Sequence, residues 1–145
     1  QMVYGRRPKR VAGATHLGKT GVDEQSTVTH DYGEGSMAVL TCSIMTTTIH
    51  EALVYGTKGY IRIPHPFWRA DRLFVSSDGS DEKEIKFDRF GNGYTYEAEE
   101  AMRCLREGEL ESEIMPLDRT MAVMEIMDEA RRQWGLVYPS EKIRQ

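Results

Sequence analysis

Alternating hydrophobic and polar positions over the first two thirds of the chain predict a series of β-strands. In such a pattern every second side chain lies on the same face of a sheet, as in a strand with one buried face. Seven runs fit a strand, at residues 9–17, 25–32, 37–47, 49–55, 60–63, 73–75 and 84–87. Glycine-rich segments such as 33–36 and 56–59 separate neighbouring runs and predict hairpin turns. This part of the chain is therefore expected to fold as a mostly antiparallel meander.

After the strands, the apolar residues recur at the spacing of an α-helix. Met102 and Leu105 fall on the apolar face of a first helix, which should end at Gly108. A second helix should follow Pro116 and end at Gly135. Its methionine-rich stripe is typical of a helix packed on a sheet rather than of a cofactor pocket. Strands followed by helices predict an α+β fold, with a single mostly antiparallel sheet and the helices packed on one of its faces.

The strand predicted at residues 37–47 has two different faces. One face is purely apolar and carries Leu40 and Cys42, whereas the other carries small or weakly polar side chains such as Thr41 and Ser43. The apolar face is expected to be buried under the helices. The second face is expected to be open, and it can be either solvated or paired with another sheet.

Composition limits the classes of function. Of the 145 residues, 39% are hydrophobic and 29% are charged, and the formal net charge is −4, which fits one soluble domain. Basic residues do not cluster beyond residues 6–10, so we expect no nucleic-acid partner. No apolar run reaches the length of a membrane span and no signal peptide is recognisable, so we expect no membrane partner. Cys42 and Cys104 are far apart and are expected to be buried, reduced thiols, which favours the cytoplasm.

Trp68 is the side chain whose position most needs an explanation. Pro64 and Pro66 lack backbone donors and should end the strand that follows Gly59. Phe67 and Trp68 come directly afterwards and should lie on a loop. Large aromatic side chains on a loop need to be covered, either by the protein core or by a ligand. The sequence leaves both alternatives open.

The four histidines are the remaining candidates for chemistry. None stands at metal-ligand spacing from another histidine or a cysteine, so we expect no metal site. His30 and His50 fall inside predicted strands and are expected to be structural. His16 and His65 fall at strand ends, where side chains can meet a ligand. The chain has no nucleophile elbow, phosphate loop or dinucleotide fingerprint, so we expect no catalytic and no cofactor-binding residue in it.

Three segments of the chain carry a family resemblance. The first is Thr-Gly-Val-Asp-Glu at 20–24, and the second is Gly-Thr-Lys-Gly at 56–59 with Pro-Phe-Trp at 66–68. The third is Tyr-Glu-Ala at 96–98, with Met-Glu-Ile-Met-Asp-Glu at 124–129. In this order they resemble the C-terminal domain of the glucose–fructose oxidoreductase / inositol dehydrogenase / MocA (Gfo/Idh/MocA) family. The resemblance covers nearly the whole chain and is closest to the dimeric dihydrodiol dehydrogenase and xylose dehydrogenase branch.

This resemblance implies a fold and a division of labour. Family members have an N-terminal Rossmann domain that binds NAD or NADP, followed by a dihydrodipicolinate-reductase-like domain on a large, mostly antiparallel sheet. The second domain closes the substrate pocket and often dimerises through its open sheet face. Residues 1–138 would correspond to most of this domain, with 1–5 ending a preceding helix and 139–145 forming a polar tail. The chain is thus expected to be a piece of a longer protein, without the Rossmann domain or the catalytic lysine.

Three residues carry over from the dihydrodiol branch as implied substrate contacts. Trp68 matches a tryptophan that lines the substrate pocket there, and Phe90 is the best match to a pocket phenylalanine before the Tyr-Glu-Ala helix. His16 stands where that branch has a basic, ligand-contacting residue, and the change to histidine departs from its pattern.

The resulting hypothesis is the C-terminal substrate-binding and dimerisation domain of a cytoplasmic NAD(P)-dependent oxidoreductase. It would act on a CH–OH group of a sugar or diol, form a homodimer through the open sheet face, and be inactive alone. NAD or NADP would bind only to the full-length protein, so the chain alone should show no affinity for NADH or NADPH. The alternative is a non-catalytic, sheet-mediated dimerisation module in which Trp68 and Phe90 are core or interface residues. A stand-alone lyase or isomerase would need an acid/base pair that the sequence does not supply.

Overall fold

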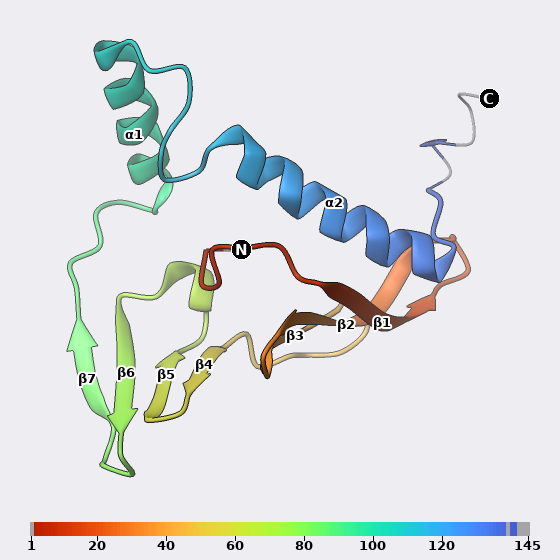
Figure 1. Cartoon of the computed structure of the whole chain (residues 1–145), viewed down its shortest axis with the longest axis horizontal. Helices are drawn as coiled ribbons and strands as arrows, with labels where there is room; N and C mark the ends of the chain where they lie inside the picture. The colour runs from red at the N-terminus through yellow and green to blue at the C-terminus, as the bar shows by residue number, and fades with distance from the viewer. Residues whose placement is uncertain (1, 139, 142–145) are drawn as a thin grey trace. The chain divides into compact units, whose positions relative to one another are not determined.

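The computed structural model describes residues 2–138 and 140–141 and has an α+β fold without a Rossmann domain among them (Figure 1). Within these residues seven strands come first and two α-helices follow, as the sequence predicts. The elements are β1 (Arg10–Leu17), β2 (Asp23–Gly33), β3 (Ser36–Ser43), β4 (Ala52–Gly56), β5 (Gly59–Ile63), the 3-10 helix η1 (Phe67–Arg69), β6 (Arg72–Ser77), β7 (Lys83–Lys86), α1 (Tyr94–Glu107) and α2 (Leu117–Trp134).

The chain divides into two compact units. The first holds β1, β2, β3 and α2, and the second holds β4 to β7, η1 and α1. In the described residues the strands form two antiparallel sheets, of order β1-β2-β3 and β4-β5-β6-β7, rather than the single sheet expected. The strand expected to run to residue 47 ends at Ser43, whose Oγ accepts hydrogen bonds from the backbone N–H of Met45 and of Thr46, each 3.0 Å long. This turn diverts the chain from the ladder, and β4 does not begin until Ala52.

The first unit has its core between α2 and β1. The Gln133 side chain of α2 donates a 2.7 Å hydrogen bond to the Val11 carbonyl of β1. The buried side chains around this contact come from the strands, from α2 and from the segment that follows it: Val11, Tyr32, Ala122, Ala130 and Leu136. Packing of this helix on the sheet confirms the expected arrangement for α2.

The expectation that the apolar face of the third strand is buried is wrong. Leu40 is 52% exposed and Cys42 is also exposed, whereas Cys104 is buried as expected. The reason lies in the order of the strands, because α2 packs on β1 and β3 lies at the opposite side of the three-stranded sheet. In α1 the predicted apolar face is likewise open, with Met102 and Leu105 both exposed, so its expected packing on a sheet is not seen among the described residues.

The second unit is built on a four-stranded meander. β4 and β5 form a hairpin in which Gly56 pairs with Gly59 across Thr57 and Lys58, as the turn sequence predicts. Gly59 has φ +153°, and a Cβ there would lie 2.0 Å from the Ser76 carbonyl oxygen of β6. Only glycine lets the two strands approach this closely. The register between β5 and β6 places Arg62 beside Phe74, and both residues line the cavity described below.

The helix ends follow the sequence. α1 stops at Gly108 and α2 at Gly135, which have φ values of +71° and +63°, the left-handed conformation that glycine adopts without strain. Near the N-terminus, Met2–Tyr4 form a turn and Gly5 has φ +62°. Gln1 and, in the expected polar tail, residues 139 and 142–145 lie outside the described residues. None of the helices in the described part is long and apolar enough to cross a membrane.

Candidate functional site

The loop after β5 folds back on the segment before β4. β5 ends at Ile63, directly before the two prolines that were predicted to stop it. The chain then forms η1, in which the backbone N–H of Phe67 donates a 3.0 Å hydrogen bond to the His50 carbonyl. This bond fixes η1, and with it Trp68, against the residues that lead into β4.

Trp68 lies in a small group of aromatic rings but is not buried. Its ring centroid is 5.0 Å from that of His50 and 5.2 Å from that of Phe67. His50 in turn stacks on His65, with centroids 5.5 Å apart and planes 12° from parallel. Trp68 nevertheless remains 58% exposed. Of the two alternatives that the sequence leaves open, burial in the core does not hold among the described residues.

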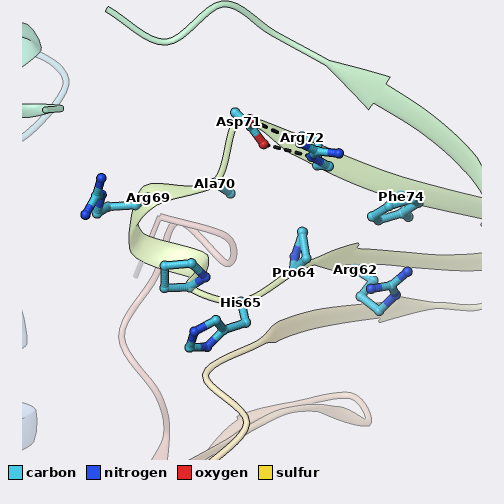
Figure 2. A pocket seen from close by; sticks show the side chains of 9 residues that line it. Arg62, Pro64, His65, Arg69, Ala70, Asp71, Arg72 and Phe74 are labelled. Carbon is cyan, nitrogen blue, oxygen red and sulfur yellow. Dashed lines mark hydrogen bonds and ion pairs between the residues drawn. The ribbon is translucent and has the colours of Figure 1, made fainter. Parts of the chain in front are cut away.

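A cavity of about 500 Å³ lies beside this loop, between β5, η1 and β6 (Figure 2). Its size is within the range of small-molecule sites. The wall is made of basic side chains, prolines and one phenylalanine ring, with a single carboxylate: Arg62, Pro64, His65, Pro66, Arg69, Ala70, Asp71, Arg72 and Phe74. His65, at a strand end as predicted, is part of this wall, whereas Trp68 is not.

Two of the cavity arginines are held by carboxylates. Arg62 donates to both carboxylate oxygens of Glu82, at 2.9 and 2.6 Å, and its guanidinium lies 4.2 Å above the centre of the Phe74 ring. Arg72 donates to both oxygens of Asp71, at 2.8 and 3.3 Å. These hydrogen bonds hold the pKa of Glu82 and that of Asp71 below their ordinary values. Arg62 and Arg72 therefore form rigid walls whose charge is already balanced.

Arg69 is different from these two arginines. It is exposed on η1, and its side chain makes no hydrogen bond or ion pair within the part of the chain that the structure describes. In Figure 2 its side chain points away from Arg72 and Phe74. The cavity can thus offer hydrogen-bond donors to hydroxyl or acidic groups, but its arginines do not converge on one point. Across the described residues there is also no group of three or more His, Cys, Asp or Glu side chains arranged to hold a metal ion.

The other two predicted substrate contacts, Phe90 and His16, do not line this cavity. Phe90, between β7 and α1, is 68% exposed, and its backbone N–H donates a 2.8 Å hydrogen bond to the Tyr96 hydroxyl. No ring contact joins Phe90 to Trp68 in the described chain. His16 belongs to the first unit, near the end of β1, and its Nε2 lies 3.8 Å from a carboxylate oxygen of Glu24. Within the described residues of the second unit the structure thus shows no ring contact between Phe90 and Trp68, and the role of His16 stays a prediction.

His50 is the residue that the sequence interpretation missed. It was assigned to a strand interior, but it lies before β4 with φ +56°, in the left-handed region. Its ring contacts Trp68, which no periodic pattern in Thr-Thr-Thr-Ile-His-Glu could have indicated. Only the register of the β4–β5 hairpin could have indicated this contact, because it brings the loop after β5 beside the residues that precede β4.

Comparison with known proteins finds dihydrodiol dehydrogenases of several organisms that are similar to this chain. No family model matches it. It is 39% identical to the trans-1,2-dihydrobenzene-1,2-diol dehydrogenase of Xenopus tropicalis over 95% of this chain. It is 32% identical to the enzyme of that name from Homo sapiens and 34% identical to that from Danio rerio, each over 97% of this chain. The chain is thus homologous to the C-terminal part of dehydrogenases of the Gfo/Idh/MocA family.

The match is to the C-terminal part of these relatives, and the chain spans 44% of their length. This confirms the family resemblance that the Gly-Thr-Lys-Gly and Tyr-Glu-Ala segments indicate. It also agrees with the α+β fold and with the lack of a Rossmann domain among the described residues.

The paired arginines give a test of the cavity geometry. Arg62→Gln should raise the pKa of Glu82 toward its ordinary value of 4.5, because the guanidinium that stabilises the carboxylate is lost, and should leave Asp71 unchanged. Arg72→Gln should instead raise the pKa of Asp71 toward its ordinary value of 3.8 and leave the pKa of Glu82 unchanged. Both pKa values can be followed by NMR titration of the side-chain carboxyl carbons.

The sign of the linked stability follows from these lowered pKa values. Each ion pair stabilises the folded chain above the ordinary pKa of its carboxyl, and this contribution is lost as the pH falls through the lowered value. In each variant, the free energy of unfolding should therefore depend less on pH in the acid range, because the contribution of one ion pair is missing. The geometry would be contradicted if either substitution shifted both carboxyls equally or neither of them.

Proposed function

We propose that this chain is the C-terminal substrate-binding and dimerisation part of an NAD(P)-dependent oxidoreductase that acts on a CH–OH group of a sugar or diol. The observation that carries the proposal is an exposed Trp68 beside a small-molecule-sized cavity, in a chain homologous to enzymes named for a cyclic diol. The cytoplasm is the proposed compartment, supported by two free cysteines.

Trp68 and the cavity would divide the work of binding. The open face of the indole offers an apolar surface on which a flat ring or the carbon face of a sugar can stack. The guanidinium groups of Arg62, Arg69 and Arg72 carry N–H donors that suit the hydroxyl oxygens of a diol. The residues of this chain would thereby bind and orient the alcohol. Holding a reactant in the right geometry accelerates its reaction.

The nicotinamide cofactor does not fit the described residues. A dinucleotide site of the Rossmann type needs parallel strands joined through a glycine-rich turn and a helix. Every ladder described here is antiparallel, and the glycines at 91 and 93 precede α1 without a preceding parallel strand. The cofactor, which accepts the hydride from the alcohol carbon, would therefore be held by a part of the full-length protein outside these residues.

Dimerisation is proposed through the open face of the β1-β2-β3 sheet. Thr29 and Val39 are paired on this face, where Met37 and Val39 are exposed apolar side chains. An exposed apolar face of this kind is typical of protein contacts, and it also favours the alternative of a non-catalytic dimerisation module.

Sedimentation should give the mass of a dimer, and Val39→Glu should give a monomer because a buried unpaired charge is costly. Leu40→Glu, on the opposite face, is the matched control; a monomeric parent chain would contradict the proposal.

Substitution of Trp68 tests the binding function. Trp68→Ala should weaken binding of trans-1,2-dihydrobenzene-1,2-diol by about tenfold or more, because the stacking surface is lost. Tyr55→Ala is the control, since Tyr55 is an exposed aromatic residue of the same unit outside the cavity wall. Isothermal titration calorimetry measures both affinities. An unmodified chain that does not bind the diol, or equal losses in the two variants, would contradict the proposed function in favour of the dimerisation module.

A further inference from the structure

We propose that His50 is a positioning residue that fixes the orientation of the Trp68 ring for ligand stacking. The inference rests on the proposed function, in which the substrate stacks on the Trp68 ring. It adds a residue that neither the family resemblance nor the cavity lining identifies.

The backbone of His50 is held in an unfavourable conformation. Its φ of +56° is in the left-handed region, which is uncommon for any residue with a Cβ, although Asn, Asp and His adopt it more often than the others. In this conformation the His50 carbonyl accepts the 3.0 Å hydrogen bond from the Phe67 N–H of η1. Strain of this kind persists only where surrounding contacts determine it. Here those contacts lead to η1 and to Trp68.

The ring of His50 lies in the middle of a three-ring group. It stacks on His65, with ring centroids 5.5 Å apart, and it contacts the Trp68 ring at 5.0 Å, with an angle of 57° between the planes. His65 is anchored in turn, since its Nδ1 lies 3.2 Å from the Ile49 carbonyl oxygen. The three rings come from two chain segments, and the carbonyls of Ile49 and His50 in the first segment contact the second segment at His65 and Phe67.

This arrangement limits the rotation of an otherwise exposed indole. A side chain with 58% exposure has few neighbours to select one rotamer. Contacts with His50 and Phe67 supply that selection and leave the remaining ring surface open. A fixed ring loses less entropy when a ligand stacks on it, so the ligand binds more tightly.

The residue type at position 50 separates the backbone role from the ring role. Asn tolerates the left-handed conformation and can keep the carbonyl contact with Phe67, but it carries no ring. Phe keeps a ring of similar shape but does not relieve the strain. A merely structural histidine would affect stability and binding together. A positioning histidine predicts that stability and binding change independently of each other.

The experiment uses the His50→Asn and His50→Phe variants in a Trp134→Phe background, so that Trp68 is the only tryptophan. His50→Asn should keep or raise the midpoint of thermal unfolding, lose the near-ultraviolet circular dichroism of Trp68, and bind trans-1,2-dihydrobenzene-1,2-diol about two- to tenfold more weakly. His50→Phe should lower the midpoint, keep the dichroism signal, and bind within about twofold of the parent.

Glu34→Asn is the matched control. Glu34 has the same φ of +56° but lies in the hairpin between β2 and β3, in the other unit. It should change the unfolding midpoint as His50→Asn does, without altering the dichroism or the affinity. The inference is overturned if His50→Asn leaves the Trp68 dichroism unchanged. If the dichroism is lost in His50→Asn but the parent chain does not bind the diol, the positioning of Trp68 by His50 stands and the proposed function fails.

Discussion

One backbone hydrogen bond, from the Phe67 N–H to the His50 carbonyl, determines the geometry of the candidate site. It closes the hairpin of β4 and β5 at its open end and joins η1 to the residues before β4. The Trp68, His50 and His65 rings meet because of it. The position of η1 also sets one border of the cavity, since Arg69 and Ala70 line it. Stacking surface and cavity thus depend on the same contact.

Electrostatics give this site its second property. Arg62 and Arg72 are each bound by a carboxylate in a two-oxygen contact, which orients the guanidinium plane and balances its charge. The wall is therefore polar and rigid without attracting anions strongly. Arg69 contributes the remaining positive charge at the rim. A neutral polyhydroxylated molecule suits such a wall better than a highly charged one, in agreement with the diol named for the homologous enzymes.

Local chemistry was predictable from the sequence, and relations between distant segments were not. Gly108 and Gly135 end the helices and the Gly56–Gly59 turn forms a hairpin, because these features depend on a few adjacent residues. The predicted burial of Cys42 was wrong, because burial at that position depends on which strand the second helix covers. The division into two sheets depends on a serine turn, and the contact of His50 with Trp68 depends on a hairpin register. Trp68 was singled out by its place after two prolines and by the family resemblance, whereas its exposure came only from the structure.

The most direct test of the central claim follows the two indole N–H signals of the chain by NMR during a titration with trans-1,2-dihydrobenzene-1,2-diol. Trp68 and Trp134 are the only tryptophans, and they lie in different units. Binding at the proposed site should shift the Trp68 signal progressively to saturation and leave that of Trp134 in place. A shift of the Trp134 signal alone, or no shift of either signal, would contradict Trp68 as the wall of a substrate site.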